Sequence, residues 1–453
     1  MTEPDAGVIE ERGGRAVHPL PAREPLPARE PLPPSVIDDL DRRGLVALST
    51  GIGPLATDLA ASPVTAYVGF DPTAPSLHIG NLVQLLTMRR IQQAGHHPLA
   101  LVGGATGLIG DPRMSGERVL NSADVVAGWV ERIREQIAHY LDFDGPYAAR
   151  MVNNLDWTAD LTTIGFLRDV GRHFRMGRML AKETVSARLN SEDGLSFTEF
   201  SYQILQGMDY LELYRRYGCT LQTGGSDQWG NLTSGTELIR KVEGRSVHAL
   251  ATPLITKADG TKFGKSEGGA VWLDPTMTSP YAFYQFWVNT DDADIGGYLK
   301  VFSLRPLDEV AELAASTAAR PQAREAQRAL AGELTALVHG QPARDAAVLA
   351  SAALFGRGDL TGVDEHTLHA ALSEAGLTEI AGEVPTVVEL FRSAGLTSSL
   401  SEARRAVAEG GASVNNVRIT EPDHIPAEAD LLHGKYLVLR RGKRAVAGAL
   451  VRG

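Results

Sequence analysis

Between about residue 64 and residue 250, short apolar runs alternate with longer stretches in which apolar residues recur every three or four positions. The run at 66–70 is followed by a helical pattern over 77–94, and Leu99–Val102 is the next apolar run. A strand, a helix and a second strand in this order form a βαβ unit with a right-handed crossover. The alternation therefore predicts a doubly wound α/β domain around a parallel sheet.

The same alternation continues further along the chain. Helices are expected near 123–141, 162–174, 178–190 and 197–217, and strands at 151–153, 219–223 and 249–255. After residue 291 the pattern is helical, with Ala-rich amphipathic stretches at 308–318, 321–338 and 343–355. A small unit then begins at Val384, with helices at 386–394 and 401–411, a strand at 412–419 and a final strand in the basic segment 435–444.

Serines in front of three helical patterns predict where those helices begin. Ser35, Ser76 and Ser401 each precede such a run, and a serine hydroxyl can accept a hydrogen bond from a free N–H of the first turn. Gly95 suits the end of the helix that Ser76 would cap, because glycine readily adopts the backbone conformation needed there.

The first 34 residues have a different composition. From Pro19 the hexad Pro-Leu-Pro-Ala-Arg-Glu occurs twice, which is typical of an extended segment that buries no core. We therefore expect four parts: a Pro-rich disordered extension over 1–34, a Rossmann-like domain over 35–265 with a mobile loop at 257–268, a helical domain over 269–375, and a small α+β domain over 384–453.

Composition limits the class of protein. The chain has 453 residues, of which 43% are hydrophobic and 22% charged, as in ordinary globular proteins. Its net charge of −11 means that a nucleic-acid partner must meet a local basic patch. The single cysteine, Cys219, excludes an intrachain disulfide and a multi-cysteine zinc site. With neither a signal peptide nor a bilayer-length apolar run, we expect a cytoplasmic protein without membrane contact.

Three loops carry candidate chemistry. His78 and Asn81 lie three residues apart on the first turn of the 77–94 helix, where free N–H groups and the helix dipole favour an anion, and Gly80 lies between them. The glycine-rich segment Gly103–Asp111 follows a strand directly, at the edge where such sheets bind ligands. Lys262 and Lys265 lie in a loop of glycines and hydroxyl residues. Each of these features, taken alone, is also found in ordinary capped helices and solvated loops that have no function in binding.

One helix carries polar residues on a single stripe. Tyr202, Gln206 and Asp209 stand at i, i+4 and i+7 of the 197–217 helix, and therefore project from one side. Such a stripe either faces solvent or lines a polar pocket. The apolar residues on both sides of it favour the pocket. Asp227, in the turn after strand 219–223, is a candidate partner for ribose hydroxyls.

Together these motifs resemble the class I aminoacyl-tRNA synthetases, and within them the bacterial tyrosyl-tRNA synthetases. The first signature of that family appears as His78-Ile-Gly-Asn81 and the second as Lys262-Phe-Gly-Lys-Ser266. Further matching strings begin at Tyr67, Gly103, Phe197, Gly224 and Ser279. The resemblance runs from about residue 36 to residue 453.

The resemblance implies that L-tyrosine is activated by ATP to tyrosyl-adenylate and then transferred to the 3′ end of tRNA(Tyr). It assigns Tyr67 and Asp209 to the substrate phenol, and Asp111, Tyr202 and Gln206 to the ammonium group. Gln228 would lie near the reacting carboxylate, and Thr73 with His78 at the departing phosphates. It assigns the remaining ATP contacts to Gly69, Gly80, Asn81, Gly225, Asp227, Lys262 and Lys265. The C-terminal basic segment resembles a small RNA-binding fold.

Some features depart from the family pattern or extend it. Asn81 stands where the signature usually has a second histidine, so it can donate a hydrogen bond but never carry charge. Arg113 and Arg118 follow Asp111 at a shorter spacing than the pattern has. We expect Mg²⁺ to accompany ATP, no tightly bound metal, and a homodimer whose interface could use apolar stretches such as Leu161–Phe166. Two alternatives stay open, a tryptophan-specific relative and a non-catalytic RNA-binding paralogue.

Overall fold

The computed structural model describes residues 35–112, 116, 120–192, 194–261, 263–266, 269–355 and 358–452. Its largest sheet has six strands in the order β1-β6-β5-β2-β3-β4. The strands are β1 (Leu48–Ser49), β2 (Thr65–Phe70), β3 (His97–Val102), β4 (Arg150–Asn153), β5 (Cys219–Gly225) and β6 (His248–Thr252). All neighbours pair in parallel except β1, which is antiparallel to β6. The predicted α/β class is confirmed.

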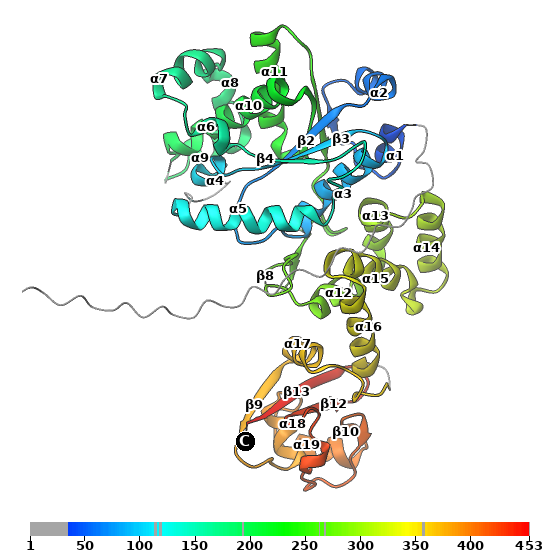
Figure 1. Ribbon diagram of the computed structural model, residues 1–453. Helices are drawn as coiled ribbons and strands as arrows, with labels where there is room; N and C mark the ends of the chain where they lie inside the picture. Colours follow the sequence, from blue (N-terminus) through cyan, green and yellow to red (C-terminus); the bar gives the residue numbers. More distant parts are fainter. Residues whose placement is uncertain are drawn as a thin grey trace, which may run out of the picture.

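Helices cover both faces of this sheet (Figure 1). One core joins alternate residues of β2 and β3 to α3 (Ile79–Gln93) and α5 (Ala123–Ala138). A second core joins the opposite residues, including Tyr67 and Leu99, to α10 (Phe197–Tyr217) and α11 (Trp229–Glu243). The central strands β2 and β3 are largely apolar because each faces a helix layer on both sides. Other helices of this part are α1 (Val36–Arg42), α2 (Ile52–Ala61), α4 (Thr106–Ile109), α6 (Leu155–Thr158), α7 (Thr163–Gly165), α8 (Met176–Leu180) and α9 (Glu183–Leu189).

The helix starts agree only in part with the serine signals. Ser35 caps α1 as predicted, by accepting from the Asp38 N–H. The prediction for Ser76 is wrong: its hydroxyl donates to Leu77 O and accepts from Gln136 Nε2, and His78 caps α3 instead. Ser399, not Ser401, caps α19 (Leu400–Ala408).

Two other expected elements are divided. The helix expected at 162–174 consists of α7, a π turn over Phe166–Val170 and a 3₁₀ turn over Gly171–His173. The strand expected at 412–419 is a hairpin of β10 (Ala412–Val414) and β11 (Val417–Arg418). Asn415 and Asn416 at its tip have φ of 46° and 65°, the left-handed pair that a two-residue hairpin turn requires.

The helical part contains α12 (Pro280–Val288), α13 (Asp292–Phe302), α14 (Leu307–Ala319), α15 (Glu325–His339) and α16 (Gln341–Phe355). It is joined to the α/β part by two buried guanidinium groups. Arg43 donates to the carbonyls of Lys300, Ser303 and Arg305. Arg90, on α3, donates to the carbonyls of Val301 and Ser303. The two arginines thus satisfy the backbone acceptors left open at the end of α13.

The last part of the chain is an α+β unit at the far end of the molecule (Figure 1). Its sheet has the order β11-β10-β12-β13-β9, with β9 (Leu377–Ala381), β12 (Tyr436–Arg441) and β13 (Ala445–Arg452). The helices are α17 (Glu365–Ala375), α18 (Val387–Ser393) and α19. The sheet therefore includes a strand before residue 384, and one core joins α16 and α17 to β12 and β13. None of the described helices has both the length and the apolar character needed to cross a membrane.

A histidine is buried among apolar groups in the helical part. The His339 ring, 5% exposed, lies edge-on to Phe283 with ring centroids 4.9 Å apart. Neither ring nitrogen has a hydrogen-bond partner within the described part of the chain. Burial disfavours the charged imidazolium and lowers the pKa of His339 to about 4.

We predict that His339 makes the folded state less stable in acid. Its pKa is lower in the folded than in the unfolded chain, so the unfolded chain binds more protons between about pH 4 and 6.5. The contribution is fully present above about pH 6.5 and falls by about 3 kcal/mol as pH drops towards 4. Thermal unfolding of the wild type and of His339→Leu measures this: the fall in the midpoint from pH 7.5 to pH 5 should be smaller in the variant. An identical fall in both would contradict it.

Candidate active site

The candidate site lies at the carboxyl ends of β2, β3 and β5. Gly69 is exposed although its neighbours in β2, Val68 and Phe70, are buried. Because glycine has no side chain, the backbone of β2 is accessible here and a ligand can lie directly against it. The loops after the three strands surround it, as expected for ligand sites in parallel α/β sheets.

The closed end of the site contains Tyr67 and Asp209. Both side chains are 2% exposed. The Asp209 carboxylate accepts from Asn154 Nδ2 at 3.0 Å and from Trp157 Nε1 at 2.8 Å. Tyr67 Oη is buried and has no hydrogen-bond partner among the described residues. A buried hydroxyl without a partner is costly, so this end is built for a polar group that comes with a ligand.

Burial sets the protonation of this pair. It raises the pKa of Asp209 to about 7, although the hydrogen bonds from Asn154 and Trp157 lower it. Burial, and then the nearby Asp209 carboxylate, raise the pKa of Tyr67 well above its usual value. Tyr67 is therefore a neutral donor at physiological pH, while Asp209 is close to its midpoint.

A chain of hydrogen bonds leads from this closed end towards the open end. Asn154 Nδ2 also donates to Thr106 Oγ1 at 2.9 Å, and Thr106 donates to Asp71 Oδ1 at 2.6 Å. The other oxygen of Asp71 accepts from Tyr202 Oη at 2.6 Å. A β-carbon at Gly103 would lie 2.1 Å from Asp71 Oδ1, so glycine is required beside this chain.

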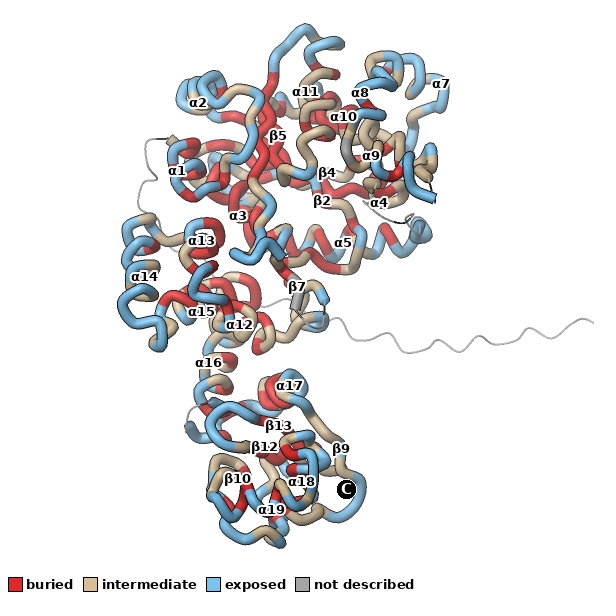
Figure 2. Tube along the Cα trace, turned by 180° about the vertical axis from the view of Figure 1, so that it is seen from behind, coloured by how far each residue is buried: buried red, intermediate tan, exposed pale blue. Residues whose placement is uncertain are grey.

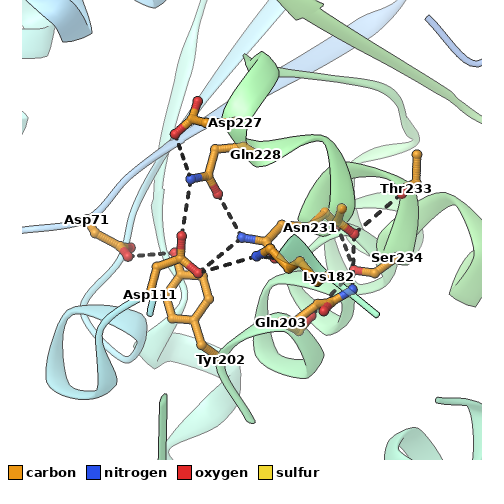
Figure 3. A network of polar contacts seen from close by, with 11 residues as sticks. Asp71, Asp111, Lys182, Tyr202, Gln203, Asp227, Gln228, Asn231, Thr233 and Ser234 are labelled. Carbon is orange, nitrogen blue, oxygen red and sulfur yellow. Dashed lines mark hydrogen bonds and ion pairs between the residues drawn. The ribbon is translucent and has the colours of Figure 1, made fainter. Parts of the chain in front are cut away.

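A second polar cluster surrounds Asp111 (Figure 3). Its carboxylate accepts from Gln228 Nε2 at 3.1 Å and from Asn231 Nδ2 at 3.3 Å, and lies 3.8 Å from Lys182 Nζ. Gln228 Nε2 also donates to the exposed Asp227 at 3.2 Å. Asp111, Gln228 and Asp227 therefore lie together, whereas Tyr202, which the resemblance groups with Asp111, donates to Asp71.

The start of α3 forms the third part. His78 Nδ1 accepts from the Gly80 N–H at 3.0 Å, and Asn81 Oδ1 accepts from the His78 N–H at 3.1 Å. A β-carbon at residue 80 would lie 2.8 Å from the His78 ring, so the ring itself occupies the space beside Gly80. Because Nδ1 accepts, the proton of the neutral imidazole is on Nε2. Burial lowers the pKa of His78, which favours this neutral donor.

The remaining predicted site residues differ in how far they are described. Thr73 is exposed, Gln206 is half-buried, and Gly225 lies at the end of β5 next to Asp227. Lys265 is in the short strand β7 (Lys265–Ser266), which pairs with β8 (Gly269–Ala270). Lys262, Arg113 and Arg118 lie outside the described residues. In the described part of the chain, no group of three or more His, Cys, Asp or Glu side chains is placed to hold a metal ion.

A cavity of about 350 Å³ lies beside the second cluster, between α8, α10 and α11. Its lining includes the basic side chains Arg175, Arg178, Lys182 and Lys241, with His173. Lys182 Nζ also donates to Asn231 Oδ1 at 2.8 Å, so one side chain belongs to both the cavity and the Asp111 cluster.

The sequence did not single out several residues of the site: Asp71, Thr106, Asn154, Trp157, Lys182 and Asn231. Asp71 and Thr106 lie inside two of the strings used for the resemblance. A carboxylate and a hydroxyl close to glycines could have indicated that these two residues belong to the site. Asn154 gave no local signal, because its partners Asp209 and Thr106 are distant in sequence.

Comparison with known proteins identifies the family of the chain. Residues 59–356 match the family model for class I tRNA synthetases (W and Y), and residues 368–447 match that of the tyrosine–tRNA ligase SYY-like C-terminal domain. Tyrosine–tRNA ligase of Streptomyces avermitilis is 64% identical over 92% of this chain and 99% of its own length. The chain belongs to the bacterial class I tyrosyl-tRNA synthetases.

More distant relatives of this synthetase family include tyrosine–tRNA ligase of Mycobacterium bovis, 56% identical over 91% of this chain and 98% of its own. A truncated mitochondrial tyrosyl-tRNA synthetase of Aspergillus nidulans has a similar structure, with a TM-score of 0.63 and 30% identity. The similarity covers 69% of this chain and 92% of that one.

We predict that Asn154 sets the pH dependence of tyrosine use. Asn154→Leu removes a donor that stabilises the Asp209 carboxylate, and should therefore raise the Asp209 pKa above about 7. The rise of kcat/KM for tyrosine with pH should then move upward by about one unit. Steady-state rates between pH 5.5 and 8.5 measure the shift. Asn190→Leu, at the exposed end of α9, is the control; an unshifted profile in Asn154→Leu would refute the assignment.

Proposed function

We propose that this site activates L-tyrosine with ATP and then transfers the tyrosyl group to the 3′ end of tRNA(Tyr). The observation that carries the proposal is the closed end of the pocket, where the Tyr67 hydroxyl, without a hydrogen-bond partner among the described residues, lies near the buried Asp209 carboxylate. A phenol can donate to Asp209 and accept from Tyr67. An indole offers a single N–H and no acceptor there, which argues against tryptophan.

The rest of the amino acid would extend from this end towards the second cluster. In this arrangement the ammonium group lies among Asp71, Asp111 and Tyr202, with Gln206 beside them on α10. Gln228 then lies near the carboxylate that attacks the α-phosphate. This attack needs no protein nucleophile, because the substrate carboxylate supplies the electrons. The protein accelerates the reaction by positioning the two substrates and by stabilising the charge that develops on the phosphates.

ATP would bind over Gly69 and the start of α3. His78 would donate its Nε2 proton to the phosphates with Thr73, while Gly80 and Asn81 complete the first turn of α3. Asp227 and Gly225 would contact the ribose. Lys262 and Lys265 would neutralise the departing pyrophosphate. Because ATP enters as its Mg²⁺ complex, the metal comes with the substrate and binds phosphate oxygens.

The tRNA would contact several parts of the chain. The cavity beside Lys182 carries four basic side chains and one carboxylate, Glu237, which pairs with Arg178 and Lys241. This excess of positive charge suits a phosphate near the reacting end. We propose that the helical domain, 269–375, approaches the anticodon region and that the unit from 384 onwards binds RNA, supported by exposed arginines such as Arg404 and Arg418. Because β9 adds to the C-terminal sheet, this unit would begin ahead of residue 384. A single cysteine and the cytosolic substrates support a cytoplasmic location.

We also propose a homodimer that forms through the α6–α10 side of the α/β part. Large apolar side chains are exposed there: Leu155, Ile164, Leu167, Met176, Leu180, Leu189 and Phe197. Ile164 is 71% exposed and Phe197 73%, and α7 and α8 are drawn largely as exposed (Figure 2). Several exposed apolar side chains in one part of the chain are typical of a protein interface. The exposed side chains include Ile164, which belongs to the stretch Leu161–Phe166 that the sequence analysis suggested for a dimer interface.

The proposed pocket predicts the outcome of amino-acid-dependent ATP–pyrophosphate exchange. Among the twenty amino acids, tyrosine should be activated strongly and phenylalanine poorly, because phenylalanine leaves Tyr67 and Asp209 unpaired. For this enzyme type, kcat/KM for tyrosine exceeds that for phenylalanine by a factor of about 10⁵. Asp209→Ala should lower kcat/KM for tyrosine at least 100-fold and that for phenylalanine much less. Equal losses for both substrates would show that Asp209 does not contact the phenol.

The dimer proposal predicts that a charge in the apolar surface separates the subunits. Phe197→Asp and Ile164→Asp should each shift the protein from dimer to monomer at micromolar concentration in sedimentation velocity. Ile425→Asp, at a residue 56% exposed in the C-terminal unit, is the matched control and should remain dimeric. A wild-type chain that is monomeric and fully active would overturn the proposal.

A further inference from the structure

Gln222 is a wholly buried polar residue next to the closed end of the pocket. It lies in β5, is 1% exposed, and pairs in register with Tyr67 of β2. Residues in register on neighbouring parallel strands project from the same face of a sheet. The Gln222 side chain therefore leaves the sheet on the face that carries Tyr67 and is covered by α10.

The neighbours of Gln222 along β5 confirm this direction. Leu221 belongs to the core on the α3 side of the sheet. On the other side of Gln222, its partner in β6 is Ala249, which contacts Leu232 of α11. Gln222 is thus a large amide on a face that is otherwise apolar at this level.

The amide oxygen of Gln222, Oε1, lacks a hydrogen-bond partner among the described residues. Tyr67 Oη, on the neighbouring strand, is also without one. An apolar side chain would fill the same volume without this cost. Two unpaired polar groups on adjacent strands, facing one way, point to a ligand group that pairs with both.

The chemistry of a phenol supplies such a group. Its oxygen donates one hydrogen bond and accepts two. Asp209 takes the proton, and Tyr67 can donate to one lone pair. The other donors at this end are already used: Asn154 Nδ2 donates to Thr106 and Asp209, and Trp157 Nε1 donates to Asp209. Rotation of the Gln222 amide exchanges its oxygen and nitrogen, and so can place an N–H donor where the unpaired Oε1 lies.

We propose that Gln222 is a third hydrogen-bonding partner of the substrate phenol, and so a specificity-determining residue. This inference rests on the pocket proposed above, with Tyr67 and Asp209 at its closed end. Gln222 donates to the lone pair of the phenol oxygen that does not accept from Tyr67. Phenylalanine has no hydroxyl, so the Gln222 amide stays unpaired when phenylalanine binds. The residue therefore contributes to the selection of tyrosine and not only to the packing of the sheet.

The test replaces Gln222 by methionine, which keeps the volume and removes the amide. Pyrophosphate exchange is measured with tyrosine and with phenylalanine. Gln222→Met should lower kcat/KM for tyrosine about tenfold, the value of one hydrogen bond in a dry site, and change that for phenylalanine less than twofold. Gln327→Met is the matched control, because Gln327 is also wholly buried with an unpaired Oε1, but in α15 of the helical part. Its tyrosine-to-phenylalanine ratio should equal that of the wild type.

An unchanged tyrosine-to-phenylalanine ratio would overturn the inference, whether both kcat/KM values stay the same or fall by an equal factor. If Gln222→Met does not fold, as judged by its thermal midpoint, Gln222→Glu keeps the shape and removes the N–H donors, and should lower the ratio in the same direction. A failure of the pocket itself is distinguishable, because Asp209→Ala would then also leave the ratio unchanged. If Asp209→Ala lowers the ratio and Gln222→Met does not, only the role of Gln222 is refuted.

Discussion

The chain of hydrogen bonds from Asp209 through Asn154, Thr106 and Asp71 to Tyr202 is the interaction on which the site depends. Its members come from α10, the start of α6, α4, and the loop after β2. A buried network of this kind stabilises only when every member has its partner. The layers of helices on both sides of the sheet keep water from the network, and the short loops after the strands fix the distances between its members.

The network also divides the pocket electrostatically. Carboxylates line both the closed end and the middle, although the chain as a whole is already acidic. They suit an amino acid that brings a hydroxyl and an ammonium group. The nucleotide side is different, because the start of α3 offers N–H groups and a neutral histidine donor. In the proposed arrangement, tyrosine and ATP would meet at a boundary between an acceptor-rich and a donor-rich region, where the α-phosphate and the attacking carboxylate have to approach.

Local periodicity was sufficient to predict the βαβ unit around β2, α3 and β3, since its strands are apolar on both faces. It also identified Tyr202 and Asp209 as projecting from one side of α10. The cap of α3 could not be predicted in this way: the local rule favours Ser76 and gives no signal for His78, whereas in the structure Ser76 bonds to Gln136 and His78 caps the helix. Asn154 was missed for the same reason, because its function depends on groups 48 and 55 residues away.

The hydrogen bonds of Arg43 and Arg90 hold the helical part against the α/β part, so that a movement at one end of α3 is transmitted to its other end. One end of this 15-residue helix carries His78 and Asn81, and the other end, through Arg90, is tied to the carbonyls that end α13. Such a helix is about 22 Å long, so a tilt of roughly 5° at the Arg90 end displaces the opposite end by roughly 2 Å. Displacements of about 1 Å already impair positioned reactions. The alignment of the helical part therefore sets the alignment of the first turn of α3. Under the proposed function, a tRNA held by the helical part would act on the reacting atoms through this one helix.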